Sequence, residues 1–204
     1  MIFETKTAAA VALAVALVGF SGSPALAEGD PARGEAVAYS CLGCHGIKGY
    51  RNAYPSYRVP KLGGQKAAYL VAALKGYKDG TRQHPTMQAQ AKSLTDQEIE
   101  DIAAYLATLG NETVLAGGTA GASFEGAATC AACHGQNGIA ASPQWPTLAG
   151  QYEDYLVHAL RQYRSGKRAN AVMMPLAANL TDAQIAQLAA YYSRLEGLET
   201  TVEE

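Results

Sequence analysis

The 204-residue sequence lacks an excess of either charge, because 16 lysine and arginine residues stand against 18 aspartate and glutamate residues. Proteins that bind phosphate backbones carry a clear positive excess, so the composition gives no reason to expect nucleic acid as a partner. The 21 glycines follow no Gly-X-Y period, which excludes a collagen-like chain. With 49% hydrophobic residues, the chain is too apolar to be disordered as a whole. A globular protein remains.

The sequence also lacks a long hydrophobic run beyond its N-terminus. Residues 8–20 form an unbroken apolar stretch, which is shorter than the roughly 20 residues that a transmembrane helix needs. Pro24 and Ala25-Leu26-Ala27 follow, as at the cleavage site of a secretory signal. We therefore expect residues 1–27 to be a signal peptide removed after Ala27, with an uncleaved membrane anchor as the alternative. The mature protein is expected in the periplasm, with at most a peripheral membrane association.

No cysteine lies outside two pentapeptides, Cys41-Leu-Gly-Cys44-His45 and Cys130-Ala-Ala-Cys133-His134. This spacing places both thiols and the imidazole on one face of a helix. Cys-x-x-Cys-His is the attachment signature of c-type haem, in which the thiols bind the vinyl groups and the histidine binds the iron. The alternatives are a four-cysteine zinc site, a thioredoxin-like pair and a disulfide within each pair. We predict two haem c groups, one at each pentapeptide.

The two pentapeptides belong to a repeat that runs through most of the chain. Pro60-Lys-Leu-Gly-Gly-Gln realigns 86 residues later with Pro146-Thr-Leu-Ala-Gly-Gln. The pentapeptides themselves are 89 residues apart, so the first copy has three extra residues between its histidine and its proline. A register held over this length indicates a tandem duplication.

Helical signals recur in both copies, and no convincing alternation of a β-strand is present. Asp30-Pro31 is typical of a helix start, and Thr95-x-x-Glu98 and Thr181-x-x-Gln184 are capping boxes. We therefore expect an all-α protein with three short helices in each copy, the middle ones at residues 65–78 and 151–164. The expected units are a domain at 28–110, a glycine-rich linker at 111–122 and a second domain at 123–204.

Methionine is rare, and two of the four methionines occupy equivalent repeat positions. Met87 and Met173 each stand seven residues before a Leu-Thr-Asp sequence, just ahead of the third expected helix. Thioether sulfur opposite histidine is a known axial ligation of c-type iron and raises its potential. We predict that Met87 and Met173 are the sixth ligands, opposite His45 and His134. Met174 is the alternative for the second iron.

Two histidines lie outside the pentapeptides. His84 stands three residues before Met87 and is an alternative ligand of the first iron, but its repeat counterpart is Asn170. We therefore expect His84 to be a surface or supporting residue. His158 is expected to be a partly buried helix residue, because an isolated histidine seldom binds a metal.

The duplicated Cys-x-x-Cys-His, the Pro-x-Leu-x-Gly-Gln segment, the methionine before Leu-Thr-Asp and the Ile-x-x-(Ile/Leu)-Ala-Ala-Tyr helix resemble dihaem cytochromes of the c4 class. The resemblance covers nearly all of the mature chain and implies two class I cytochrome c domains packed face to face. It implies that the carbonyls of Pro60 and Pro146 accept the imidazole proton of each haem histidine. Arg82 and Arg168 become candidates to pair with haem propionates, with solvated surface charges as the alternative.

The same resemblance implies outer-sphere electron transfer, in which no substrate binds the metal and the protein is a carrier, not an enzyme. The partners it suggests are a quinol-oxidising complex as donor and a terminal oxidase as acceptor, bound through small transient interfaces. One alternative is a cytochrome subunit of a larger dehydrogenase, such as a flavocytochrome. Another is a dihaem enzyme such as a peroxidase.

Residues 50–58, Tyr-Arg-Asn-Ala-Tyr-Pro-Ser-Tyr-Arg, lie where the first copy is longer than the second. Tyrosine and arginine are enriched in the hot spots of protein interfaces. We expect this insertion to border the first haem and to serve docking or the contact between domains. A tyrosine-packed loop that shields the haem is the alternative.

Overall fold

The computed structural model describes residues 28–110 and 124–200. The expected signal peptide and linker lie outside these ranges. Within them, no helix is both long enough and apolar enough to cross a membrane. The described residues are helical and contain only isolated β-bridges, so the prediction of an all-α protein is confirmed.

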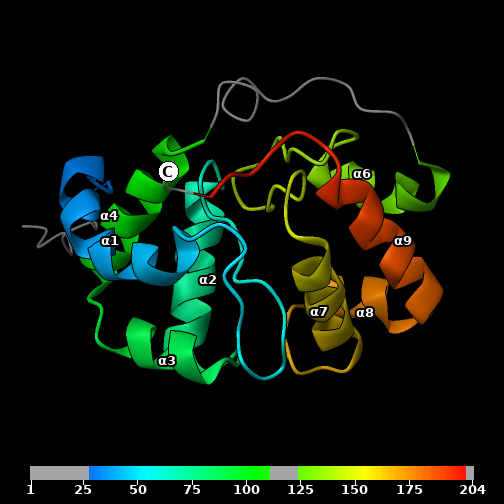
Figure 1. Cartoon of the computed structure of the whole chain (residues 1–204), viewed down its shortest axis with the longest axis horizontal. Coiled ribbons are helices and arrows are strands. Elements are labelled where there is room, and N and C mark those ends of the chain that lie inside the picture. Colours follow the sequence, from blue (N-terminus) through cyan, green and yellow to red (C-terminus); the bar gives the residue numbers. More distant parts are fainter. Residues whose placement is uncertain (1–27, 111–123, 201–204) are drawn as a thin grey trace, which may run out of the picture.

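The first half of the chain contains α1 (Pro31–His45), α2 (Ala67–Asp79), α3 (Pro85–Lys92) and α4 (Asp96–Thr108), as Figure 1 shows. Helix α1 begins at Asp30, whose carboxylate accepts hydrogen bonds from the amides of Ala32 and Arg33. Helix α4 begins with the predicted capping box, in which Thr95 and Glu98 each bind the other's backbone amide. Local capping chemistry therefore sets both helix starts.

The second half contains the short 3-10 turn η1 (Glu125–Ala127), α6 (Ala128–His134), α7 (Glu153–Arg164), α8 (Met173–Ala178) and α9 (Asp182–Ser193). The second half has only a few residues before its pentapeptide, and the helix that carries this pentapeptide is accordingly short. The capping box at Thr181 and Gln184 opens α9, as predicted.

Two differences from the sequence prediction concern the helices. Helices α3 and α8 were not expected, and the two methionines lie within them and not just ahead of the next helix. Both helices are too short to show a hydrophobic period, and an isolated helix of this length is unstable in water. Each is held in place by a buried alanine, Ala91 in α3 and Ala177 in α8.

Each half has a hydrophobic core of its own. The buried side chains of the first core are Ala38, Leu70, Ile102, Ala103 and Leu106. Those of the second are Ala127, Leu156, Leu188, Ala189 and Tyr192. Cys41 packs against the first core and Cys130 against the second, so each pentapeptide lies at the edge of its own core.

Helix α1 lies directly against α4 because two glycines of the N-terminal segment carry no side chain. A Cβ atom on Gly34 would overlap the backbone of Asp101, and one on Gly29 would overlap that of Glu100. This contact places the C-terminal end of α1, with the first pentapeptide, on the first core.

The two halves lie side by side, with α2 and α7 facing the centre of the molecule (Figure 1). Gln65 accepts a hydrogen bond from the Thr147 amide (2.9 Å) and donates to its carbonyl (3.0 Å). Gln151, the counterpart of Gln65, makes the same two bonds with Lys61, both at 3.0 Å. Helices α2 and α7 therefore begin two residues later than predicted, because each glutamine bonds the other half.

Candidate haem-binding sites

The pentapeptide histidines are the last residues of α1 and α6, and both are buried. The Nδ1 atom of His45 lies 2.8 Å from the carbonyl oxygen of Pro60, and that of His134 lies 2.8 Å from the carbonyl oxygen of Pro146. A carbonyl only accepts, so Nδ1 carries the proton in both rings and Nε2 keeps its lone pair. Burial lowers the pKa of both rings, which favours the neutral form that binds a metal.

All four cysteines are free, half-buried thiols in the structure. Burial raises the pKa of Cys41 and of Cys130, so these two sulfurs are held as thiols. Among the described residues, which include every cysteine and histidine of the chain, no three metal-binding side chains gather. The structure therefore contains neither the disulfides nor the zinc cluster considered as alternatives.

Met87 and Met173 occupy equivalent places in the two short helices, and both side chains are half-buried. The neighbouring Met174 is 36% exposed, and its methyl end lies beside Gly166. In the first half the side chain of Gln88 lies in the same way beside Gly80. Met174 is thus the counterpart of Gln88, and Met173 is the counterpart of Met87.

His84 is the N-cap residue of α3, and its Nδ1 atom accepts a hydrogen bond from the Met87 amide at 3.3 Å. Its ring also meets the edge of the Tyr57 ring, with 6.4 Å between centroids. The structure thus gives His84 a supporting contact to the helix that carries Met87. His158 is half-buried in α7 and stacks on Tyr57, with 4.0 Å between ring centroids.

Arg82 lies between the two halves. Its guanidinium carbon lies 4.4 Å from the centroid of the Tyr77 ring in its own half. Its Nη2 atom donates to the Tyr155 hydroxyl of the other half at 2.8 Å. Burial is the main cause of the lowered pKa of His45; the Pro60 hydrogen bond opposes it, and the positive charge of Arg82 lowers the pKa further. Arg82 therefore connects the first haem histidine electrostatically to the contact between halves.

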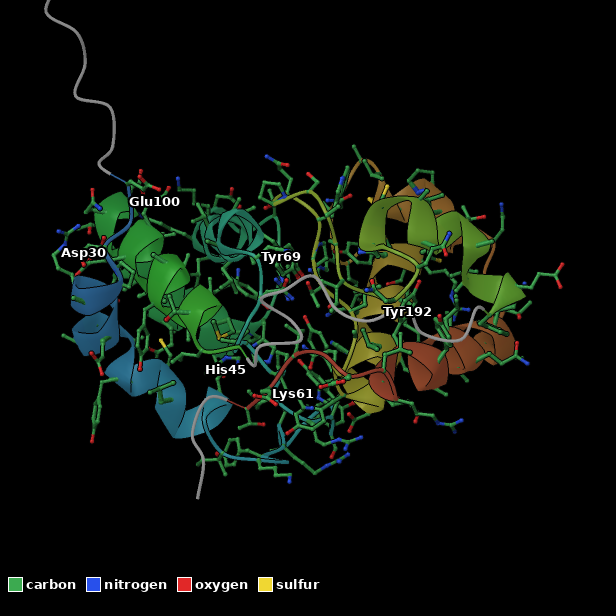
Figure 2. All side chains as sticks on the ribbon, turned by 90° about the horizontal axis from the view of Figure 1, so that it is seen from above. Asp30, His45, Lys61, Tyr69, Glu100 and Tyr192 are labelled. Atoms are coloured by element: carbon green, nitrogen blue, oxygen red, sulfur yellow. The ribbon has the colours of Figure 1, made fainter. Side chains whose placement is uncertain are left out.

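Arg168 repeats this arrangement from the second half. Its guanidinium lies over the Tyr163 ring at 4.5 Å, and its Nη2 atom donates to the Tyr69 hydroxyl at 2.9 Å. Tyr69 lies between the two halves in Figure 2. Arg168 is only 6% exposed, and it forms a β-bridge with Arg82. Arg168 is therefore not a solvated surface charge, and Arg82 is half-buried between the two halves.

No carboxylate of the described residues pairs with either arginine. A buried guanidinium next to a half-buried one, without an anion, is costly, because buried charges are normally paired. A haem c group carries two propionates. The free thiols, the oriented imidazoles and the unpaired guanidiniums therefore fit covalent haem in each half.

The insertion at residues 50–58 contacts the second half. Arg58 donates to the Asp154 carboxylate from its backbone amide (3.1 Å) and from Nε (3.0 Å), and Arg51 pairs with the same carboxylate at 3.1 Å. Tyr57 is buried, whereas Tyr54 is 96% exposed. A groove of about 710 Å³ is lined by the insertion, by residues 83–86 at the start of α3 and by the end of α7. The expected contact between domains is present, and Tyr54 projects into solvent.

Two pairs of residues have roles at the contact between halves that were not predicted from the sequence. Tyr69 and Tyr155 accept the arginine hydrogen bonds, and Gln65 and Gln151 join the halves. One feature of the sequence could have indicated these roles: in each pair the same residue type occurs in both copies, 86 residues apart, although most positions of the repeat differ.

Comparison with known proteins gives two tandem matches to the model of the cytochrome c family, at residues 31–110 and 119–196. Cytochrome c4 of Pseudomonas aeruginosa is 34% identical over 184 residues, which cover 83% of this chain and 90% of that protein. The thiosulfate dehydrogenase electron acceptor of Thiomonas intermedia is 42% identical over 197 residues, 88% of each chain. The structure of reduced cytochrome c4 from Pseudomonas stutzeri matches with a TM-score of 0.65 at 28% identity, covering 82% of this chain and 100% of that one.

The two family matches divide the chain as the repeat does, and each contains one pentapeptide. The relatives match along both halves, which agrees with a dihaem protein and not with a single-haem carrier fused to an unrelated domain. The chain belongs to the cytochrome c family, as a tandem member with two c-type haems that transfers electrons.

Proposed function

We propose that the protein is a periplasmic electron carrier in which each iron is held by the pentapeptide histidine and the repeat-related methionine, His45 with Met87 and His134 with Met173. The equivalent hydrogen bonds from the two imidazoles to proline carbonyls, both 2.8 Å long, are the strongest support. They orient each ring, keep its Nε2 lone pair free and make the imidazole a better electron donor. Haem c, when bound, supplies the one-electron couple.

The remaining residues of each site have positioning and electrostatic roles in this proposal. His84 caps α3 through the Met87 amide and so holds the helix that carries the methionine. Arg82 and Arg168, at the contact between halves, would offset the negative charge of the haem propionates. With a histidine and a methionine available to each iron, neither haem would offer an open position for a substrate, and the protein would act as a carrier and not as an enzyme.

The respiratory partners proposed are a quinol-oxidising complex as donor and a terminal oxidase as acceptor. A second candidate donor is a dehydrogenase for a reduced sulfur compound, favoured by the relative named as the electron acceptor of thiosulfate dehydrogenase. Mixing the ferric holoprotein with each reduced donor in a stopped-flow instrument distinguishes the two. The physiological donor reduces both haems in milliseconds to seconds at micromolar concentration.

Export is tested by the mass of the mature protein. A periplasmic extract is expected to contain a polypeptide that begins at Glu28 and carries two haems. A cytoplasmic product that retains residues 1–27 would contradict the proposed location.

The ligands are tested by the long-wavelength absorption band that ferric haem shows when methionine sulfur is bound. Met87→Ala and Met173→Ala are each expected to remove half of the band and to lower the potential of one haem, because a thioether ligand raises the potential. Met174→Gln is the matched control and leaves the band and both potentials unchanged. Loss of half the band in Met174→Gln, with an intact band in Met173→Ala, would transfer the assignment to Met174.

A further inference from the structure

The two short methionine helices differ sharply in what they expose. The exposed side chains on and just before α8 are apolar: Val172 (40% exposed), Met174 (36%) and Leu176 (46%). Their counterparts 86 residues earlier, all within α3, are polar: Thr86, Gln88 and Gln90. The duplication makes this an internal comparison, because the residues occupy equivalent repeat positions, although α8 begins two residues later than α3. A cluster of exposed apolar side chains marks an interaction site more often than a random surface.

The charges near α8 also differ from those near α3. In the second half, Arg161 and Arg164 share one carboxylate, Asp182, at 3.3 and 2.8 Å. Lys167 is exposed and forms no ion pair with a described residue. Three cations therefore face one carboxylate at the end of α7.

The equivalent part of the first half has no excess of cations. Lys75 pairs with Glu100, and Lys78 pairs with Asp96, so both cations are neutralised. Asp79 adds a further carboxylate, and a threonine stands where the second half has Lys167. Lys92, in the last turn of α3, balances the charge of Asp79. The surface beside α3 is thus polar and without a cationic excess, whereas the surface beside α8 is apolar and net positive.

We propose that the α7–α8 corner, formed by Arg161, Arg164, Lys167, Val172, Met174 and Leu176, is the docking surface for a redox protein with an apolar contact area flanked by carboxylates. The inference rests on the proposed function and deepens it, because Met173 begins the same helix and a partner docked there exchanges its electron through the second domain. Weak redox complexes use small interfaces of this kind, in which charge steers the encounter.

Two other occupants fit the corner less well. A second copy of the chain would bring two net positive corners together, which costs energy through like-charge repulsion. A lipid surface binds long amphipathic helices, and α8 (Met173–Ala178) is only six residues long. An acidic protein surface satisfies both the apolar centre and the unpaired lysine.

The test uses the holoprotein and gold surfaces coated with a mixed monolayer of methyl-terminated and carboxylate-terminated alkanethiols. Adsorbed mass is measured with a quartz-crystal microbalance, and the exchange of one electron per haem with the gold is measured by voltammetry. Val172→Thr combined with Leu176→Gln is expected to weaken adsorption about tenfold, since two apolar side chains no longer leave water. Lys167→Thr weakens adsorption at low salt only.

The matched control is Gln90→Leu, which places an apolar side chain at the exposed α3 position equivalent to Leu176 and is expected to leave adsorption unchanged. An unchanged haem spectrum and unchanged potentials in solution show that each variant is folded. The proposal is overturned if the α8 variant adsorbs like the original protein. It is also overturned if the original protein adsorbs equally well to a monolayer of methyl and ammonium groups, or binds phosphatidylglycerol vesicles as tightly as it binds the carboxylate monolayer. A dimer that the original protein forms and the α8 variant loses would overturn it as well. Failure of the proposed function would appear separately, as two haems without reversible one-electron waves in bulk solution.

Discussion

Arg82 and Tyr155 join the two halves of the chain through a 2.8 Å hydrogen bond, and their repeat counterparts Arg168 and Tyr69 form the same bond in the opposite direction. Each half therefore donates one of these hydrogen bonds to the other half and accepts one from it. A duplicated sequence makes such reciprocal contacts only if the halves are related by an approximate twofold rotation. The two glutamine contacts, which are also reciprocal, follow the same rotation.

The first prediction concerns these phenols. Tyr155→Phe removes the acceptor of a charged donor, so we expect the free energy of unfolding to fall by about 1.5–2 kcal/mol. Tyr69→Phe is expected to have the same effect, because its contact with Arg168 is equivalent. Guanidinium chloride unfolding of the holoprotein measures both. Tyr39→Phe, at an exposed position, is the control and is expected to change nothing.

The second prediction concerns the insertion. Asp154 accepts hydrogen bonds from Arg58 and pairs with Arg51, and all three side chains are partly exposed to solvent. Asp154→Asn is expected to lower the free energy of unfolding by about 1 kcal/mol at low salt. In about 1 M salt the difference is expected to shrink, because the Debye length falls to about 3 Å. A salt-independent loss would show that the contact is not mainly ionic; Glu35→Gln is the exposed control.

The third prediction concerns acid. Asp101 accepts hydrogen bonds from Arg33, from the Asp30 amide and from Gln97, and these hold its pKa well below the usual value. A depressed folded-state pKa means that the carboxylate stabilises the fold above its unfolded pKa of about 3.9, and that this stability is lost as the pH falls below it.

The repeat supplies an internal control for this effect, because the counterpart of Asp101 is Gln187. Hydrogen exchange between about pH 5 and pH 3 is expected to show α1 and α4 losing protection before α7 and α9. Asp101→Asn is expected to destabilise the first half at neutral pH and to remove its extra acid sensitivity. Equal acid sensitivity of both halves in the original protein would contradict this role.

The fourth prediction compares two glycines. A Cβ atom on Gly197 would overlap the Ala149 carbonyl, next to the contact in which Glu199 and Gly63 exchange backbone hydrogen bonds of 3.2 Å between the halves. Gly197→Ala is therefore expected to cost about 1–3 kcal/mol and to lower the Tm by several degrees.

Gly43→Ala serves as the opposite case. Gly43 lies within α1, a Cβ atom there meets nothing within 4 Å, and the second pentapeptide already has Ala132 at this position. Alanine favours a helix over glycine by about 1 kcal/mol, so this variant is expected to raise the Tm and to keep both haems. A destabilised Gly43→Ala or a neutral Gly197→Ala would contradict the packing described.

The sequence by itself determined the features that depend on near neighbours. The Cys-x-x-Cys-His spacing is a property of one helical turn, and the capping boxes at Thr95 and Thr181 join residues three positions apart. The duplication was likewise readable from identities at a constant offset, and with it the equivalence of Met87 and Met173. Helices α3 and α8 were not readable, because packing of Ala91 and Ala177 and not a hydrophobic period holds them.

Only the tertiary structure decided which residues meet across the molecule. Arg82 and Tyr155 are separated by 73 positions, and Arg168 and Tyr69 by 99, so neither contact leaves a local pattern. The same holds within the insertion, where Tyr57 is buried and Tyr54 is exposed although both are tyrosines of one short loop. Side chains of equal chemistry receive different roles because burial depends on what the folded chain places opposite them, and residue type and spacing do not contain that information.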